Sequence, residues 1–132
     1  MSDGDTISVM WEDRAFKIRL EGVDCPESGQ DFSNRAKQFT SQLVFGKIVK
    51  VKVLDLDVHR RMIARIYAGD KDVGLELVKA GLAWHLRKYS NDPVLAREEA
   101  RARAARRGLW SVKHPVPPWE WRNRPRRRSK EK

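Results

Sequence analysis

Apolar and polar residues alternate most strictly over residues 16–21, which read FKIRLE. A period of two residues predicts a β-strand with one buried face and one solvent-facing face. A glycine ends the alternation, and Asp24, Pro26 and Glu27 follow closely. Because Pro26 restricts its own backbone and that of the residue before it, the two carboxylates are held on a rigid corner. The sequence therefore predicts a strand that leads directly into an acidic turn.

The same alternation predicts further strands over residues 7–11, 48–55 and 61–67. In the last of these, the odd-numbered positions, which include Arg61 and Arg65, share one face. The even-numbered positions are apolar and share the other face. The Asp-Gly pair within residues 3–6 is a turn signal and predicts a turn before the first strand.

Three segments have the pattern of a helix. Apolar residues within 32–46 recur every three or four positions, which predicts an amphipathic helix. A shorter helix is predicted over residues 73–80, where a glycine ends it. A third helix begins with Asp92 as N-cap and Pro93 as first helical residue, and it continues toward residue 108.

The order of these elements is strands, helix, strands and then helices, which suggests a small barrel with helices packed outside it. The prolines from residue 115 onward argue against regular structure, so we expect an extended tail that Trp119 or Trp121 fixes to the body. The predicted division is a folded domain over residues 1–112 and a basic tail rich in Pro, Trp and Arg over 113–132.

Composition fits one domain of 132 residues with a single core, since 40% of the residues are apolar and 35% are charged. The chain contains no apolar run of membrane-spanning length, and its first residues lack the features of a signal peptide. The lone Cys25 excludes an internal disulfide.

The net charge of +10 is concentrated at one end of the chain. Residues 101–132 contain twelve Lys and Arg and two Glu, whereas residues 1–100 contain sixteen basic and sixteen acidic side chains. Such a tail is either a solvated end or a binding surface for a polyanion such as nucleic acid. Composition alone leaves both interpretations open.

Four motifs in order resemble the staphylococcal nuclease (thermonuclease) family: DGDT at 3–6, RLEGVDCPE at 19–27, the strand that starts at Arg61, and GLAW at 81–84. The ending PPWEWR at 117–122 also resembles bacterial members. The resemblance implies an α+β fold of mainly β structure, a five-stranded OB-fold barrel with three helices, here with its first strand truncated. It also implies a calcium-dependent enzyme that cuts DNA and RNA and leaves 3′-phosphates.

The resemblance assigns roles to individual residues. It places the calcium ligands at Asp5, Asp24 and the backbone carbonyl of Cys25, and the catalytic residues at Arg19, Glu27 and Arg61. We further expect nucleic-acid contacts from Arg60, Arg65, Tyr89, Arg126, Arg127 and Arg128. The sequence departs from the family pattern at Cys25, where a small residue is usual, and at His59-Arg60, where Tyr-Gly is common.

These residue types suit phosphodiester hydrolysis. The transition state concentrates negative charge on the phosphoryl oxygens, so the site needs cations where that charge develops. Calcium accepts carboxylate, carbonyl and water oxygens without strict geometry, and arginine offers a planar fork for two phosphate oxygens. A glutamate within hydrogen-bond reach of the attacking water can act as general base.

Three functional interpretations follow. The first is a sequence-nonspecific nuclease acting on DNA and RNA, with single strands preferred and the protein monomeric. The second is a nucleic-acid-binding OB-fold module without catalysis. The third is a tail that only binds anionic surfaces, which leaves the acids unexplained. For bacterial relatives the resemblance favours secretion, although this chain alone does not settle the compartment.

Overall fold

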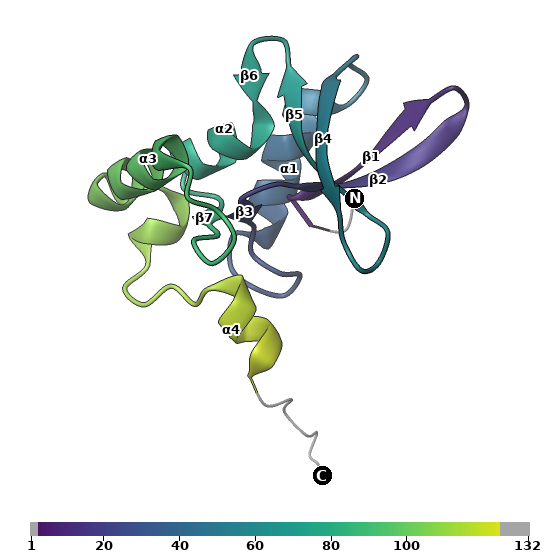
Figure 1. The fold of residues 1–132 in the computed structure, drawn as a ribbon. Helices are drawn as coiled ribbons and strands as arrows, with labels where there is room; N and C mark the ends of the chain where they lie inside the picture. Colours follow the sequence, from purple (N-terminus) through teal and green to yellow (C-terminus); the bar gives the residue numbers. More distant parts are fainter. Residues whose placement is uncertain (1–2, 125–132) are drawn as a thin grey trace.

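A sheet of five strands, a two-stranded sheet and four α-helices make up the fold in the computed structural model, which describes residues 3–124 (Figure 1). The strands are β1 (Thr6–Trp11), β2 (Arg14–Leu20), β3 (Val23–Asp24), β4 (Lys50–Leu56), β5 (Met62–Ala68), β6 (Lys71–Asp72) and β7 (Trp84–His85). The helices are α1 (Ser33–Val44), α2 (Val73–Lys79), α3 (Pro93–Ala104), the 3-10 turn η1 (Gly108–Ser111) and α4 (Pro118–Asn123). The predicted α+β class is confirmed.

Strands β1 and β2 form an antiparallel hairpin in which Thr6 pairs with Arg19 and Trp11 pairs with Arg14. The two residues between the strands, Glu12 and Asp13, both have positive φ angles, 48° and 62°. Such a two-residue turn matches the right-handed twist of the flanking strands. The hairpin therefore fixes the register that places Arg19 beside the start of β1.

The strand order of the larger sheet is β1-β2-β5-β4, with β6 added to β5. Strand β2 pairs with β5 in parallel, and the other pairs are antiparallel. Within residues 3–124, β1 and β4 are the sheet edges, and an apolar groove of about 900 Å³ lies along them. Its lining includes Val9, Phe16 and Val51.

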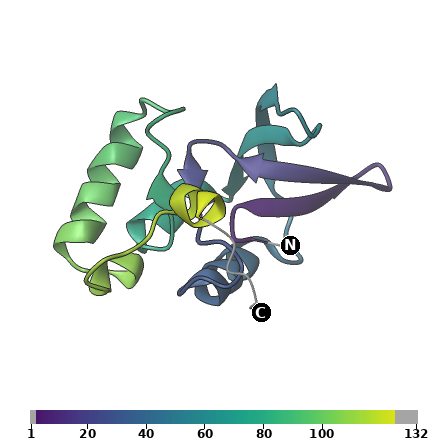
Figure 2. The ribbon, with the colours of Figure 1, turned by 90° about the horizontal axis from the view of Figure 1, so that it is seen from below.

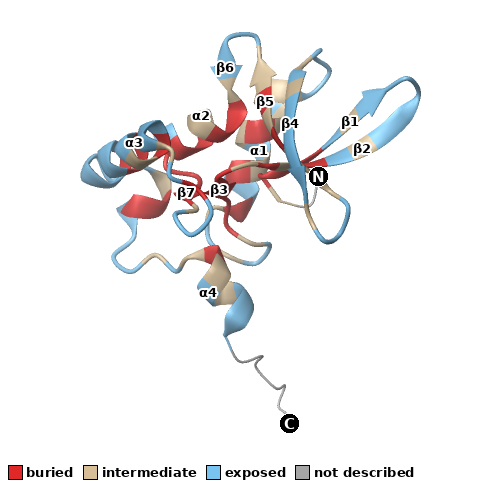
Figure 3. Cartoon of the chain, viewed as in Figure 1, coloured by how far each residue is buried: buried red, intermediate tan, exposed pale blue. Residues whose placement is uncertain are grey.

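The core lies between the inner face of the sheet and the helices. Ile18, Leu20, Ile66 and Leu77 are each at most 2% exposed. Burial of one such aliphatic side chain stabilises the fold by roughly 1.5–3 kcal/mol. Figure 3 shows that buried positions gather where β2, β5 and α2 meet, whereas the hairpin tip and much of β4 are exposed. The core thus supports the ends of β2 and β3, where the acidic turn lies.

Helices α2 and α3 begin as the sequence indicates. The Asp72 side chain caps α2 by accepting from the Leu75 amide, and the Asp92 side chain caps α3 by accepting from two amides of its first turn. Helix α1 differs, because its N-cap Phe32 has a φ of 71° and offers no side-chain oxygen to the helix. Packing of its apolar face against the core therefore holds α1 in place.

The chain after α2 passes very close to the chain after α3. Gly81, with a φ of +75°, is in contact with Arg107, and a Cβ at Gly81 would lie 2.3 Å from the carbonyl oxygen of Arg107. The amide of Leu109 donates to the carbonyl of Gly81 over 2.8 Å. Only glycine fits this crossing, which joins the α2 and α3 layers.

The three predicted helices of the folded domain are α1, α2 and α3, but the prediction of an extended tail is wrong over residues 118–123. Residues 118–123 form α4, because Pro118 occupies the first helical position, where a missing amide proton is tolerated. Trp119 packs edge-on against Trp84, with ring centroids 5.4 Å apart, so the predicted tryptophan contact with the body is confirmed. Figure 2, seen from below, shows α4 nearly end-on in front of the middle of the molecule. The division at residue 112 stays a prediction.

Candidate active site

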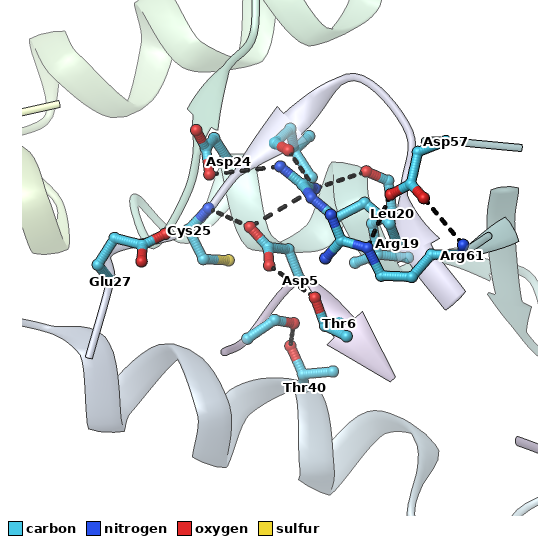
Figure 4. A network of polar contacts seen from close by, with 12 residues as sticks. Asp5, Thr6, Arg19, Leu20, Asp24, Cys25, Glu27, Thr40, Asp57 and Arg61 are labelled. Carbon is cyan, nitrogen blue, oxygen red and sulfur yellow. Dashed lines mark hydrogen bonds and ion pairs between the residues drawn. The ribbon is translucent and has the colours of Figure 1, made fainter. Parts of the chain in front are cut away.

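Asp5 is held at the start of β1 by the turn before it and by helix α1. The carbonyl of Gly4 accepts a 2.7 Å hydrogen bond from the Thr40 hydroxyl. A Cβ at Gly4 would lie 2.9 Å from the Cβ of Ala36, so the turn lies directly against the helix. The Leu20 amide then donates to the carbonyl of Asp5 over 2.9 Å. These contacts bury Asp5, which is 3% exposed, at the end of β2 (Figure 4).

Asp24 reaches the same place from β3, which pairs with β7 through Asp24 and Trp84. Asp24 is 1% exposed. Burial raises the pKa of its carboxyl, although Arg122 and Arg19 oppose that effect with hydrogen bonds and positive charge. The site thus contains a carboxylate whose ionised form depends on neighbouring cations.

Cys25 links the two aspartates. Its amide donates a 2.7 Å hydrogen bond to Oδ2 of Asp5, so the backbone after Asp24 is fixed against β1. Its thiol is completely buried, and burial raises the pKa of that thiol well above its usual range. The side chain is therefore a small apolar group, and its replacement of the usual small residue is accommodated by the core.

Arg19 bridges both aspartates. Nη1 donates to the carbonyls of Leu20 and Val23 over 2.8 and 2.7 Å, and it lies 3.5 Å from Oδ2 of Asp5. Nη2 donates to Oδ1 of Asp24 over 3.3 Å. The guanidinium is 16% exposed and held by backbone oxygens as well as by charge. Arg19, Asp5 and Asp24 therefore form one cluster, as their roles in the sequence prediction require.

Glu27 lies on the loop that follows Pro26. Its amide donates to the Gln30 side chain over 2.8 Å, and its carbonyl accepts from the Gln30 amide, which closes a turn. The Glu27 side chain remains 25% exposed. It is thus the accessible carboxylate of the group, beside the two buried ones.

Arg122 of helix α4 joins this cluster, although no local sequence pattern predicts a role for it. Its Nη2 lies 2.9 Å from Oδ2 of Asp24, and its Nη1 lies 2.5 Å from Oε2 of Glu27. The hydrogen bond with Asp24 and the charges of both acids raise the pKa of Arg122. One sequence feature could have indicated a role for Arg122, namely its position in PPWEWR, the ending that resembles bacterial members of the family.

Arg61 does not contact the two aspartates. Its Nε donates to Oδ2 of Asp57 over 2.7 Å, and Oδ1 of Asp57 accepts from the amides of Arg61 and His59. Although burial opposes the effect, these hydrogen bonds lower the pKa of Asp57. Arg60 has a φ of +63°, a conformation that suits the glycine common at this place in the family. The loop keeps its turn without that glycine.

The register of the sheet shows on which side Arg61 lies. Strand β2 pairs with β5 in parallel, with Ile18 opposite Met62 and Arg19 opposite Ile63. Because side chains two residues apart share a face, Arg61 lies on the same face as Arg19, one strand away. Its side chain is 33% exposed, so the guanidinium is accessible from solvent while it pairs with Asp57.

The residues predicted to contact nucleic acid lie in different settings. Arg65 is bound by three carboxylates, those of Glu21, Asp72 and Asp92, so it connects β5 to the starts of α2 and α3. Tyr89 is 72% exposed. Arg60 is also exposed, whereas Arg126, Arg127 and Arg128 lie outside the described residues. Nucleic-acid contacts by these residues stay predictions.

The predicted calcium ligands suit a hard divalent ion in their chemistry. Within residues 3–124, no three His, Cys, Asp or Glu side chains converge as a metal-binding group. The predicted calcium ligands include only two side chains, so they do not form such a group of three. Calcium can nevertheless be bound by two carboxylates, one backbone carbonyl and water molecules. Asp5 and Asp24 are buried carboxylates that already face a shared cation, Arg19. These residues therefore fit a cation bound by oxygen atoms.

Comparison with known proteins identifies the family of this chain. The family described as "Staphylococcal nuclease homologue" matches residues 17–112. The chain belongs to the staphylococcal nuclease family. It is 44% identical to an uncharacterized endonuclease of Escherichia coli O157:H7 over 123 residues, which cover 92% of this chain and 80% of that protein. An uncharacterized endonuclease of Haemophilus influenzae is 35% identical over 123 residues, 92% of this chain and 69% of its own length.

A plant member of the staphylococcal nuclease family is also similar. A staphylococcal-like nuclease of Arabidopsis thaliana is 40% identical over 113 residues, 86% of this chain but 35% of the plant protein. Family and relatives together support a nuclease function, and family membership implies a divalent metal ion. None of the helices within the described residues is long and apolar enough to cross a membrane.

Proposed function

We propose that this chain is a calcium-dependent nuclease that hydrolyses phosphodiester bonds of DNA and RNA without sequence preference. The observation that carries the proposal is the cluster of Asp5, Asp24 and Arg19 beside the accessible Glu27. Buried carboxylates are costly unless a cation compensates them. An acidic pair next to arginines is the arrangement that binds a divalent ion and an anionic phosphate together.

Asp5, Asp24 and the carbonyl of Cys25 would hold the ion. When bound, calcium supplies a Lewis acid that stabilises negative charge on the phosphoryl oxygens. The 2.7 Å hydrogen bond from the Cys25 amide keeps Oδ2 of Asp5 in place. Among residues 3–124, Oδ1 of Asp5 has one weak partner, the Thr6 hydroxyl at 3.4 Å, which leaves it the freer of the two oxygens for a cation.

Glu27 would act as the general base. Its carboxylate lies on the accessible side of the cluster, where an attacking water can reach it. A proton taken by Glu27 from that water leaves a hydroxide aimed at the phosphorus. The bond from phosphorus to the 5′ oxygen then breaks, the leaving oxygen takes a proton from water, and the products are a 3′-phosphate and a 5′-hydroxyl.

Arg19 and Arg61 would bind the phosphate. Arg19 lies on β2, Arg61 immediately precedes the neighbouring strand β5, and continuation of the β2–β5 register places both on one face of the sheet. Two guanidinium groups can hold separate phosphoryl oxygens while the nucleophile attacks. Because Arg19 donates to two backbone carbonyls, its contribution is a fixed positive charge at the rim of the aspartate pair.

The remaining expectations concern the substrate and the state of the protein. Nothing among the described residues resembles a helix that reads bases in a groove, which favours cleavage without sequence preference. We propose that single strands are preferred, that the protein acts as a monomer, and that the basic end of the chain adds phosphate contacts. Arg60, Arg65 and Tyr89 remain candidates for additional contacts.

The test is cleavage of a labelled single-stranded DNA and of a matching RNA, with calcium and with a calcium chelator. The proposal predicts cleavage of both in calcium, none with the chelator, and products that accept a 5′ label but need phosphatase before 3′ extension. Tight binding without cleavage would contradict the proposal and favour a non-catalytic OB-fold module. Cleavage at the same rate with the chelator would exclude a requirement for calcium.

A further inference from the structure

Helix α4 is fastened over the acidic cluster by contacts outside the cluster itself. Trp119 packs on Trp84, and the carbonyl of Val116 accepts a 2.9 Å hydrogen bond from the Gln30 side chain. A Cβ at Gly29 would lie 3.7 Å from the ring of Trp121, so the helix also lies close to the loop after Glu27. Figures 1 and 2 agree that α4 lies beneath the β3 and β7 end of the molecule. Arg122 is therefore presented to the cluster by a docked helix.

The Arg122 guanidinium binds carboxylate oxygens of Asp24 and Glu27. Nη2 is 2.9 Å from Oδ2 of Asp24, Nη1 is 3.4 Å from Oδ1 of the same carboxylate, and Nη1 also binds Glu27. Thus one cation binds both oxygens of a proposed calcium ligand and one oxygen of the proposed general base. Any ion that binds Asp24 competes with Arg122 for the same oxygen atoms.

Arg122 and Arg19 differ in how firmly they are held. Arg19 donates to the carbonyls of Leu20 and Val23, and it is 16% exposed. Within residues 3–124, the hydrogen bonds of the Arg122 side chain go to Asp24 and Glu27, and this side chain is 43% exposed. If another cation binds the two carboxylates, Arg122 loses these hydrogen bonds, whereas Arg19 keeps its hydrogen bonds to backbone carbonyls. Arg122 is thus the less firmly held of the two cations.

We propose that Arg122 is a built-in competitor of the metal ion, which neutralises Asp24 and Glu27 and must leave them before a divalent cation binds. The inference rests on the proposed function, because it takes Asp24 as a metal ligand. Helix α4 keeps its tryptophan contact when the side chain leaves, so the guanidinium remains at the rim of the site. The C-terminal helix thereby sets the metal concentration at which the site becomes occupied.

The test is direct calorimetric titration with calcium ions alone, without nucleic acid. We compare the wild-type chain with Arg122→Gln and with Arg124→Gln, a matched control that removes the same charge from the end of the same helix. Arg124 lies over the ring of Trp121 instead of the acids. A neighbouring charge changes the affinity of a carboxylate for a proton by about tenfold to a thousandfold, and we take this range as a guide to its affinity for calcium. Because Arg122 is partly exposed, we expect an effect near the tenfold end of the range.

The proposal predicts that Arg122→Gln binds calcium about tenfold more tightly than the wild type, because the competing charge is gone. The Arg124→Gln control should remain within about twofold, since this residue is exposed and its charge is screened. Adding Asp24→Asn to Arg122→Gln should abolish the gain. Equal or weaker calcium binding by Arg122→Gln would overturn the inference while leaving the proposed nuclease intact. Absence of calcium binding in all variants would overturn the metal site and the inference together.

Discussion

Replacement of Arg19 by alanine tests whether the two buried aspartates depend on a shared cation. Arg19 donates to two backbone carbonyls at 2.8 and 2.7 Å and pairs with Asp5 and Asp24 at 3.5 and 3.3 Å. Arg19→Ala leaves two carboxylates whose side chains are 4% and 1% exposed without this partner. The variant should therefore fold with a large loss of stability.

The size of the loss follows from those contacts. Removal of one partner from a buried ion pair costs about 3–5 kcal/mol, because the other charge stays buried and unpaired. Arg122 still pairs with Asp24, and the Cys25 amide still donates to Asp5, so both acids keep part of their compensation. We therefore expect the lower end, a loss of about 3 kcal/mol in the free energy of unfolding.

Urea denaturation followed by tryptophan fluorescence measures this loss, with Arg14→Ala as control. Arg14 lies on the same strand and is exposed, so the control removes the same charge without touching the cluster. The loss for Arg19→Ala should be smaller at pH 5 than at pH 7. An unpaired buried carboxyl has its pKa raised, so it takes up a proton as the pH falls and the penalty decreases. A loss no larger than that of the control, or one independent of pH, would refute this reasoning.

Three further outcomes are expected. Gly81→Ala should destabilise the fold far more than Gly69→Ala, since both have positive φ but only the first methyl group meets neighbouring atoms; equal urea midpoints would contradict this. Replacing the arginines at 126–128 by glutamine should lower the salt slope of single-strand binding by about 2, and an unchanged slope would exclude phosphate contacts there. Arg65 lowers the pKa of Asp92, so Asp92 stabilises the fold above about pH 4 and this contribution is lost as the pH falls further. The gap in unfolding free energy between the wild type and Asp92→Asn should therefore close in acid, and a constant gap would argue against the ion pair.

Local sequence patterns sufficed for the parts of the fold with a clear period or cap. The alternation in residues 16–21 predicted β2, and Asp92-Pro93 predicted the start of α3. The motifs also named Asp5, Arg19 and Asp24, which meet in the structure. These residues meet because of the hairpin register and the position of β3. Local periodicity does not predict that they meet, so this expectation came from the resemblance to the family.

Other parts could not be read from local patterns. Strands β3 and β7 contain two residues each, too few to show a period, yet their pairing fixes Asp24. Helix α4 contains six residues among prolines, and it is stabilised by the contact between Trp119 and Trp84, which lie far apart in the chain. The approach of Arg122 to Asp24 spans 98 residues, so it follows only from the packed structure.

The most direct test of the nuclease site compares Glu27→Gln with the wild type in single-turnover cleavage of a bound oligonucleotide in calcium. Glu12→Gln, in the exposed hairpin turn, is the matched control. General-base catalysis contributes about a hundredfold to ten-thousandfold to rate, so the Glu27 variant should cut slower by that factor and bind the oligonucleotide nearly as well. The control should cut at the wild-type rate. Cleavage by Glu27→Gln within a few-fold of the wild type would show that Glu27 is not the base and would contradict the proposed site.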